Sequence, residues 1–323
     1  MRSVEKYALL FIQLCFFLVL SACSEPEAPK VKIAINPWPG YEFVYLAQEK
    51  GFFKEQKLDI ELIELPSLAD VQRVFVQGRA DGMASTMIET VQATGLTQKS
   101  STIILIPDYS NGGDVIVSSK QVASFSELKG RRIGAEIGSL GMYILAQALD
   151  KQGMSLSDVD IINVEQLEAE TSLLNGAVDA VVSYPPYSTN ILKHDQFHQV
   201  FDTSQIPEDI IDVISIRTDV LTTLPDDWLA RFHKVWDKAL TYSQANQDEA
   251  YGIMATREGI SKEDFADALT GLQLLDSRES IKAIQADQTA KNVVKVCTTL
   301  EHAKTINFDC KKTTPMIKFA QFK

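Results

Sequence analysis

Residues 31–53 read VKIAINPWPGYEFVYLAQEKGFF, and this stretch predicts the fold. Apolar and polar residues alternate over 31–36, as they do in a β-strand. A loop rich in proline and glycine follows, and helical periodicity then runs over 44–51. A second alternating pattern begins at Asp59 and ends at Leu65. Strand, helix and strand in this order predict a βαβ unit with two parallel strands.

The same alternation of strand and helix patterns continues to about residue 182. Further strand patterns lie at 102–106, 114–118, 160–164 and 178–182, and helical patterns at 68–78, 86–95, 140–152 and 166–175. The sequence therefore predicts an α/β fold with mostly parallel sheets flanked by helices. From Pro225 onward the chain is almost wholly helical, and one helix face carries Trp228, Leu229, Phe232, Val235, Trp236, Ala239 and Leu240. We expect this helical C-terminal tail to pack on the first α/β unit.

Two extended stretches, 106–113 and 211–216, interrupt the pattern and are predicted to cross between two lobes. Two crossings imply that one lobe is inserted into the other. We therefore expect lobe 1 to comprise residues 31–112 plus 213–323 and lobe 2 to comprise residues 113–212, with a two-strand hinge between them. Each lobe then has the size of an ordinary domain.

Composition and motifs exclude several classes of protein. The chain has 323 residues and a formal net charge of −12, with no basic run, so no nucleic-acid partner is expected. It contains no P-loop, GxGxxG, HExxH or GxSxG motif, and we predict neither a cofactor nor a catalytic site. His194 and His198 stand four residues apart beside Asp195, a spacing that suits a metal ion. Their polar surroundings favour a solvated helix end instead, and no metal is predicted.

The N-terminus has the pattern of an export signal. Residues 1–22 form a weakly positive start followed by a short apolar stretch, and Leu20-Ser21-Ala22-Cys23 resembles the bacterial lipobox. The resemblance implies a signal peptide over 1–22, lipidation of Cys23 and a tether over 23–30. The protein is then exported and anchored by lipid in the bacterial cell envelope, on the periplasmic face of a membrane if the cell is Gram-negative. An ordinary secretory signal with a chance cysteine is the alternative.

Export leaves Cys297 and Cys310 in an oxidising compartment, because Cys15 is lost with the signal and Cys23 is lipidated. Twelve residues lie between the two cysteines, and we predict a disulfide that closes a short loop. Two free thiols or a metal-binding pair are the alternatives.

Six short motifs along residues 36–180 resemble those of one protein family. They are Asn36-Pro37-Trp38-Pro39-Gly40-Tyr41, Lys50-Gly51-Phe52-Phe53, Gln77-Gly78-Arg79-Ala80-Asp81-Gly82, Leu128-Lys129-Gly130-Arg131-Arg132-Ile133-Gly134, Gly138-Ser139-Leu140-Gly141 and Asn175-Gly176-Ala177-Val178-Asp179-Ala180. Together they resemble ABC-transporter solute-binding proteins of the nitrate/sulfonate/taurine and thiamine-precursor group. The resemblance covers about residues 31–220 well and the helical tail only loosely.

This resemblance implies a periplasmic-binding-protein type II fold, with a small-molecule ligand held in the cleft between two lobes. The expected partners are an ABC permease and its ATPase, and the expected state is a monomer. One alternative is a sensory subunit that presents its ligand to a membrane receptor. Another is an enzyme acting on a pyrimidine-like compound, since the group has enzymatic relatives.

The candidate site lies in the loops that leave the strands, because open parallel sheets bind ligands beyond the carboxyl ends of their strands. The candidate ligand-binding residues are Asn36, Trp38, Gly40, Tyr41, Ser85, Thr86, Met87, Tyr109, Ser110, Asn111, Gly138, Ser139, Leu140, Gly141, Tyr184 and Tyr187. The turn 138–141 opens a helix, whose free N–H groups are available to a polar group of the ligand. A tight turn without ligand contact is the alternative there.

The composition of these loops bears on the charge of the ligand. They contain no Lys, Arg or His, but they hold one tryptophan and four tyrosines, with Glu42, Glu89 and Asp108 inside or next to them. Aromatic faces and carboxylates suit a flat ligand that is neutral or cationic. The opposing interpretation is a small anion such as a sulfonate, held by Ser139 and the N–H groups of its turn.

Overall fold

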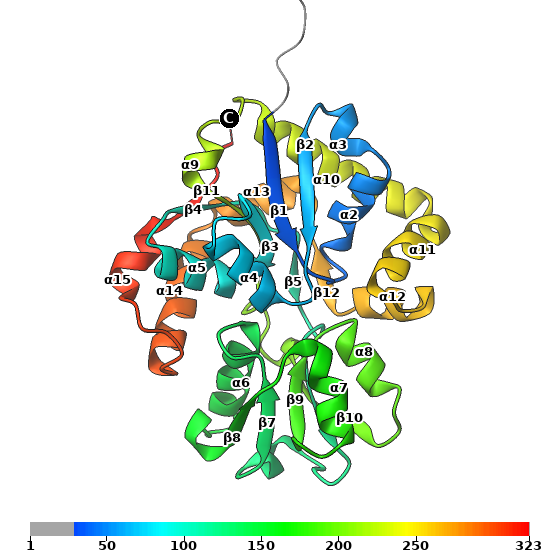
Figure 1. Ribbon diagram of the computed structural model, residues 1–323, viewed down its shortest axis with the longest axis vertical. Helices are drawn as coiled ribbons and strands as arrows, with labels where there is room; N and C mark the ends of the chain where they lie inside the picture. Colours follow the sequence, from blue (N-terminus) through cyan, green and yellow to red (C-terminus); the bar gives the residue numbers. More distant parts are fainter. Residues whose placement is uncertain (1–28, 323) are drawn as a thin grey trace, which may run out of the picture.

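Strand β1 (Lys30–Ile35) lies inside the larger of two sheets (Figure 1). The computed structural model describes residues 29–322, in which β1 runs parallel to β2 (Asp59–Glu64) and to β3 (Gly82–Thr86). Helix α2 (Glu42–Glu49) connects β1 to β2, so the βαβ unit predicted from the sequence is confirmed. The predicted signal peptide, Cys23 and the tether up to residue 28 lie outside the described residues.

The large sheet has six strands in the order β13-β4-β11-β3-β1-β2. Its remaining strands are β4 (Ser101–Leu105), β11 (Asp212–Arg217) and β13 (Ile317–Phe319), and the helices beside them include α3 (Phe52–Glu55), α4 (Leu68–Val76) and α5 (Met87–Thr97). Strand β11 runs antiparallel to both of its neighbours, while β13 runs parallel to β4. Strands β3, β4 and β11 are almost wholly buried and form the centre of this lobe.

The small sheet repeats this arrangement with five strands in the order β10-β6-β9-β7-β8. The strands are β6 (Val115–Ser119), β7 (Arg132–Ala135), β8 (Asp160–Asn163), β9 (Ala180–Ser183) and β10 (Phe197–Asp202), and the helices are α6 (Leu140–Lys151), α7 (Gln166–Leu174) and α8 (Tyr187–Leu192). Here β7 is parallel to β8 and β9, and β6 is antiparallel to β9 and β10. The α/β class with parallel strands and flanking helices is therefore confirmed.

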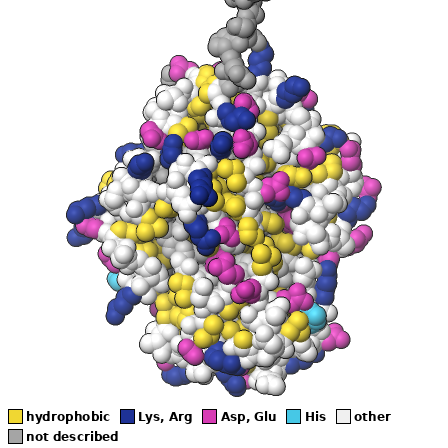
Figure 2. Space-filling model, in the orientation of Figure 1, with side chains coloured by type: hydrophobic (Ala, Val, Ile, Leu, Met, Phe, Trp, Pro, Cys, Tyr) yellow, Lys and Arg dark blue, Asp and Glu magenta, His cyan; other side chains and the backbone are white. Residues whose placement is uncertain are grey.

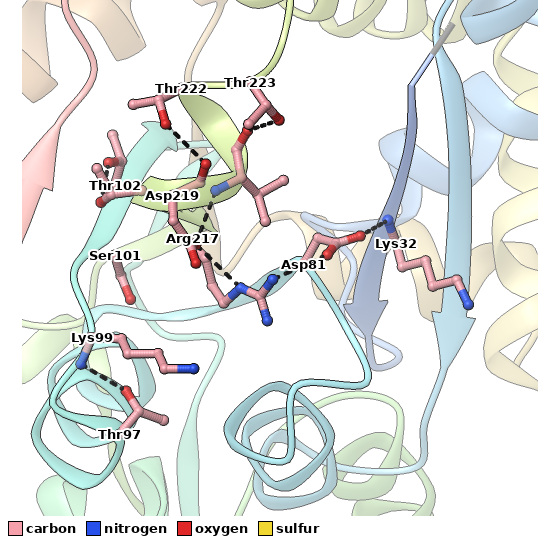
Figure 3. Close-up of polar contacts among 12 residues, drawn as sticks. Lys32, Asp81, Thr97, Lys99, Ser101, Thr102, Arg217, Asp219, Thr222 and Thr223 are labelled. Carbon is pink, nitrogen blue, oxygen red and sulfur yellow. Dashed lines mark hydrogen bonds and ion pairs between the residues drawn. The ribbon is translucent and has the colours of Figure 1, made fainter. Parts of the chain in front are cut away.

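The repeated Gly-x-x-Asp motif has the same structural task in both lobes. In the large lobe, Asp81 accepts a hydrogen bond from the backbone N–H of Lys32 at 3.0 Å and pairs with Arg217 at 3.6 Å (Figure 3). In the small lobe, Asp179 accepts one from the backbone N–H of Arg132 at 3.0 Å and pairs with its guanidinium at 3.2 Å. Both aspartates thus fasten the start of a central parallel strand, at the edge of the sheet opposite its carboxyl ends.

Two segments cross between the sheets. Strand β5 (Asp108–Ser110) carries the chain from the large lobe to the small one, and a bridge pairs Tyr109 with Ile211 of the returning segment. Strand β12 (Leu272–Leu274), from the C-terminal region, also pairs with β5. The strands of the large sheet come from 30–105, 212–217 and 317–319, and those of the small sheet from 115–202. We retain lobe boundaries near residues 112 and 213 as a proposal.

The C-terminal third packs mainly on the large lobe, as expected. Its helices are α9 (Thr218–Leu221), α10 (Trp228–Ala245), α11 (Gln247–Glu258), α12 (Lys262–Leu269), α13 (Ser277–Gln285), α14 (Asp287–His302) and α15 (Cys310–Thr313). The apolar face of α10 is buried, and Trp236 and Phe232 meet Phe43 and Phe53 with ring centroids 5.8 and 6.1 Å apart. The region is not purely helical, because β12 and β13 join two of the sheets.

A disulfide fastens the end of the chain. Cys297 in α14 and Cys310 in α15 are bonded, with their Cα atoms 5.7 Å apart. Helix α15 contacts α5 of the large lobe, and α14 contacts both α5 and α6. Within residues 29–322, no helix has the length and apolar character needed to cross a membrane.

Candidate functional site

A small closed cavity of about 10 Å³ lies between the two lobes. Its lining comes from Asn36, Trp38, Tyr41, Leu68, Thr86 and Asp212 of the large lobe and from Asp114, Leu140 and Tyr184 of the small lobe. This volume has room for about one water molecule. The structure therefore shows the lobes closed on each other, and a larger ligand would enter only after they move apart.

Aromatic rings form one wall of this cavity. Trp38, in the loop after β1, lies with its ring centroid 6.1 Å from Tyr184 and 6.5 Å from Tyr41. Tyr187 continues the cluster, 5.8 Å from Tyr184, and its hydroxyl donates to the backbone carbonyl of Pro66 in the other lobe. Aromatic residues of both lobes thus meet at the closed interface, where they offer flat apolar surface with polar edges.

Buried carboxyl groups lie against these aromatic rings and form an acidic wall of Asp108, Asp114 and Asp212. Trp38 Nε1 donates to Asp108 Oδ1 at 3.3 Å, and the hydroxyl of Tyr41 donates to Asp212 Oδ1. Asp114, at the start of the small lobe, is 1% exposed, and neither of its carboxylate oxygens has a hydrogen-bond partner among the described residues. Asp108 Oδ2 and Asp212 Oδ2 are likewise buried without one. Such oxygens are costly to bury as charges unless a proton or a positive group accompanies them.

Burial controls the ionisation of these groups. Desolvation raises the pKa of Asp108 and of Asp114 to about 7. Desolvation, together with the negative charges of Asp108 and Asp114, also holds the pKa of Asp212 well above its usual range. The three carboxyl groups therefore retain protons at a pH where exposed aspartates are ionised, and Asp108 and Asp212 titrate as a coupled pair.

Glu89 joins the lobes at the edge of this site. Its Oε1 accepts the hydroxyl of Ser139 and the backbone N–H of Leu140, both at 2.8 Å, and its Oε2 accepts the backbone N–H of Thr86 at 3.1 Å. One carboxylate thus serves the N-terminus of α5 in its own lobe and that of α6 in the other. At the turn before α6, the predicted N–H donor of Leu140 faces a carboxylate of the protein itself.

Several other predicted residues support the cavity without lining it. A Cβ atom on Gly40 would lie 2.0 Å from Asp108 Oδ2, so a side chain there would collide with the acidic wall. A Cβ atom on Gly141 would lie 3.3 Å from the backbone nitrogen of Glu136, so a side chain there would also be crowded. Ser85 and Met87 are fully buried in the large lobe, where Ser85 donates to the Thr86 carbonyl.

The predicted hinge residues also lie apart from the cavity. The Ser110 hydroxyl bonds that of Thr203 at 2.8 Å, and the backbone N–H of Asn111 donates to the Gly271 carbonyl. Tyr109 is half-buried in β5, and Gly138 occupies an outer turn with φ of 83°. Tyr109, Ser110 and Asn111 hold the crossing segments in place, whereas Gly138 belongs to the turn before α6, and none of the four lines the cavity.

The sequence analysis missed Leu68, Asp114 and Asp212 in the lining. Asp114 and Asp212 each stand at the beginning of a strand pattern, where an aspartate is ordinarily solvated. The available signal was that Asp114 directly follows the predicted crossing segment 106–113 and that Asp212 lies within the other, 211–216. The strands at these crossings begin, rather than end, at the cleft. Leu68 is the first residue of α4, and it lines the cavity because the N-terminus of this helix lies beside it.

The histidine pair considered for a metal is divided by the fold. His194 Nε2 bonds Glu170 Oε1 at 2.6 Å, while His198 lies in β10 opposite Ser118. Among residues 29–322, no group of three or more His, Cys, Asp or Glu side chains has the geometry to hold a metal ion.

Comparison with known proteins places this geometry in context. Residues 38–250 match the family model described as NMT1/THI5 like. The chain is 26% identical over 235 residues to a Haemophilus influenzae protein named for thiamine biosynthesis, covering 70% of this chain and 73% of that protein. It is 27% identical over 154 residues to the 4-amino-5-hydroxymethyl-2-methylpyrimidine phosphate synthase THI13 of Saccharomyces cerevisiae, covering 47% of this chain and 45% of the synthase.

Solved structures share the architecture. The alkanesulfonate-binding protein SsuA from Xanthomonas axonopodis pv. citri, bound to MOPS, superimposes with a TM-score of 0.76 at 15% identity. The match covers 92% of this chain and 100% of that one. The likeness confirms the predicted two-lobed periplasmic-binding-protein fold.

Proposed function

Because the chain belongs to the NMT1/THI5-like family, we propose that it is a solute-binding protein. In this proposal it captures a small organic molecule between its lobes and delivers it to the permease and ATPase of an ABC importer. The observation that carries the proposal is the closed cavity, whose lining comes from both lobes. A pair of lobes on a two-segment hinge can open to admit a ligand and close over it.

The contacts across the interface support a closure of this kind. Besides the bonds from Glu89 to α6, the backbone N–H of Leu68 lies 3.4 Å from the Tyr184 hydroxyl, and Lys193 pairs with Asp264 at 2.9 Å. Each contact joins one lobe to the other through a few polar atoms. Such contacts are individually modest, so a bound ligand can decide whether the closed arrangement is favoured.

A thermal-shift screen of the purified mature protein tests the binding role. The panel contains nitrate, alkyl sulfonates, thiamine precursors, polyamines and small amines. A ligand that binds only the folded state at a hundredfold excess over its Kd raises the free energy of unfolding by about 2.7 kcal/mol. Uptake of the best ligand by cells with and without the gene then separates an importer subunit from a sensory subunit. No stabilisation by any compound would contradict the binding role.

The relatives named as synthases make an enzyme the second candidate. Among the residues that line the cavity there is no Lys, His or Cys, and the acid–base groups are carboxyls and tyrosines. The binding proposal therefore predicts that a ligand leaves the protein chemically unchanged, whereas a synthase would alter it.

The proposal includes a lipid anchor at Cys23. We expect the wild-type protein to fractionate with membranes and the Cys23→Ala variant to be released from them. Ser24→Ala, beside the cysteine, is the matched control and should stay with the membranes. A Cys23→Ala protein that remains in the membrane fraction would exclude lipidation as the anchor.

A further inference from the structure

Within residues 29–322, the acidic wall of the cavity has no positively charged side chain beside it in the lining. Its lining contains no Lys, Arg or His, although it includes Asp114 and Asp212. The buried guanidinium of Arg257 is engaged elsewhere, with Glu42 and Glu64. Figure 2 shows Asp and Glu side chains lying among hydrophobic ones across the middle of one face, where Figure 1 shows the lobes meeting.

The arrangement that would hold an anion is already occupied. In a helix N-terminus, free backbone N–H groups and the helix dipole attract negative charge. At α6, the Leu140 N–H and the Ser139 hydroxyl both donate to Glu89, which is fully buried. An anionic ligand would have to displace this carboxylate while also lying near Asp114.

From these two observations we infer that the ligand is an organic cation, an ammonium or amidinium compound, whose positive N–H groups bind the free carboxylate oxygens of Asp114 and Asp212. This inference rests on the proposed solute-binding function and names the class of its ligand. The aromatic rings of Trp38, Tyr41 and Tyr184 provide the surface for the rest of the molecule. Neither oxygen of Asp114 accepts a hydrogen bond within residues 29–322, and Asp212 Oδ2 has no partner there except Asp108, with which it shares a proton when one of the two carboxyls is protonated. In their ionised forms these oxygens accept several N–H donors from one group.

Binding of a cation changes the protonation of these carboxyl groups. The carboxyl groups that act on Asp114 are Glu89, Asp108 and Asp212, and the hydroxyls of Tyr41 and Tyr184 also line the cavity. In the absence of a cation, burial favours protonated carboxyls. A cation that binds Asp114 favours the ionised form instead. Because the pKa of Asp114 is about 7, binding near pH 7 releases a fraction of a proton, about one half, to the solvent.

The test uses matched sets of compounds that share a skeleton and differ in charge. One set is benzamidine, benzamide and benzoate, and a second is phenethylamine, phenethyl alcohol and 3-phenylpropionate. Affinities for the mature protein at pH 7 are measured by calorimetry. We expect the cation to bind at least thirtyfold more tightly than its neutral analogue in at least one set, with the anion weakest. Repeating the titration in buffers of different ionisation enthalpy should show this fractional release of a proton.

Asp114→Asn should weaken binding of the cation by about ten- to hundredfold and abolish its advantage over the neutral compound. Asp160→Asn changes the net charge equally at an exposed site on the small lobe and should change nothing. If Asp114→Asn fails to fold, Asp212→Asn decides, because the amide oxygen still accepts the Tyr41 hydroxyl.

The remaining outcomes contradict the inference in different ways. Tightest binding by the anions, or by the neutral compounds, would overturn it while leaving the binding function standing. Stabilisation by calcium or magnesium chloride without any effect of the organic cations would replace it with a metal site. If these compounds and the wider screen all fail to bind, the proposed function itself fails, and the inference falls with it.

Discussion

At the scale of single residues, the two aspartates at the crossing segments distinguish this site. Asp114 and Asp212 lie at the starts of β6 and β11, the strands that are antiparallel within their sheets. That direction brings the beginning of each strand to the cleft, where the parallel strands end. Trp38, Tyr41 and Tyr184, which the sequence analysis placed in loops after strands, line the cavity, because such loops can be located from periodicity. The sequence analysis missed the two aspartates, because the direction of a strand depends on tertiary contacts that periodicity does not contain.

The ionisation of Asp114 makes the ligand-free protein sensitive to pH. Its pKa is about 7 in the folded state and near 3.9 in an unfolded chain, so folding favours the protonated form. The protonated carboxyl therefore adds to the free energy of unfolding. This stabilisation is fully present below about pH 4 and is lost as the pH rises through 7. We expect Asp114→Asn to remove that loss and to raise the free energy of unfolding at pH 8 by about 1–4 kcal/mol relative to wild type.

Urea denaturation at pH 5 and pH 8 checks this expectation. The difference between variant and wild type should be larger at pH 8, and Asp160→Asn should show no such difference. A variant that is less stable than wild type at pH 8 would mean that Asp114 has a stabilising partner in the folded protein.

At the scale of elements, the contact between α5 and α6 joins the two lobes beside the cavity. The bond from Ser139 to Glu89 joins two helices of different lobes, and the Thr86–Glu89 capping box holds the carboxylate in position. Ser139→Ala removes the hydroxyl bond and leaves the capping box intact. We expect ligand affinity to fall about three- to tenfold, because a bond of about 1 kcal/mol is lost only from the closed form.

Calorimetry with the best ligand of the screen measures this effect. The exposed Ser126→Ala in the small lobe is the control and should keep wild-type affinity. Unchanged affinity in Ser139→Ala would show that the bond contributes nothing to the liganded state.

The disulfide stabilises the element that ends the chain. Both cysteines are buried, and the bond closes a loop with a sequence separation of 13. A loop of this length is worth about 3 kcal/mol in the chain-entropy model. We expect the Cys297→Ser/Cys310→Ser double variant to lose about this much free energy of unfolding, measured by urea denaturation. A double variant as stable as wild type would contradict this expectation. It would show that the disulfide does not lower the entropy of the unfolded chain enough to stabilise the fold.

The elements show where prediction from sequence succeeds. Long periodic segments were placed within a few residues, as for the helical pattern 140–152 and α6 (Leu140–Lys151). Strands β5, β12 and β13 have three residues each, which is too few to show a period. Strands β12 and β13 form by pairing with β5 and β4, and such tertiary contacts cannot be found from periodicity. The tail was therefore predicted as helical although it completes two sheets.

At the scale of the whole molecule, the two sheets share one topology. Strands β2, β1, β3, β11 and β4 occur in the same order as β8, β7, β9, β6 and β10. Their equivalent Gly-x-x-Asp motifs fasten the ends far from the cleft, so the loops at the facing ends of the two sheets can carry the site. Two similar lobes joined by two crossings account for a cavity that depends on both of them.

As a solute-binding protein, this molecule is expected to close over a small solute and to release it unchanged. The most direct measurement is mass spectrometry of the ligand recovered after prolonged incubation with the purified mature protein and removal of unbound compound. We expect about one ligand per protein chain, with its mass and fragmentation unaltered. Recovery of a chemically converted product, or of no ligand under conditions in which the screen reports stabilisation, would contradict it.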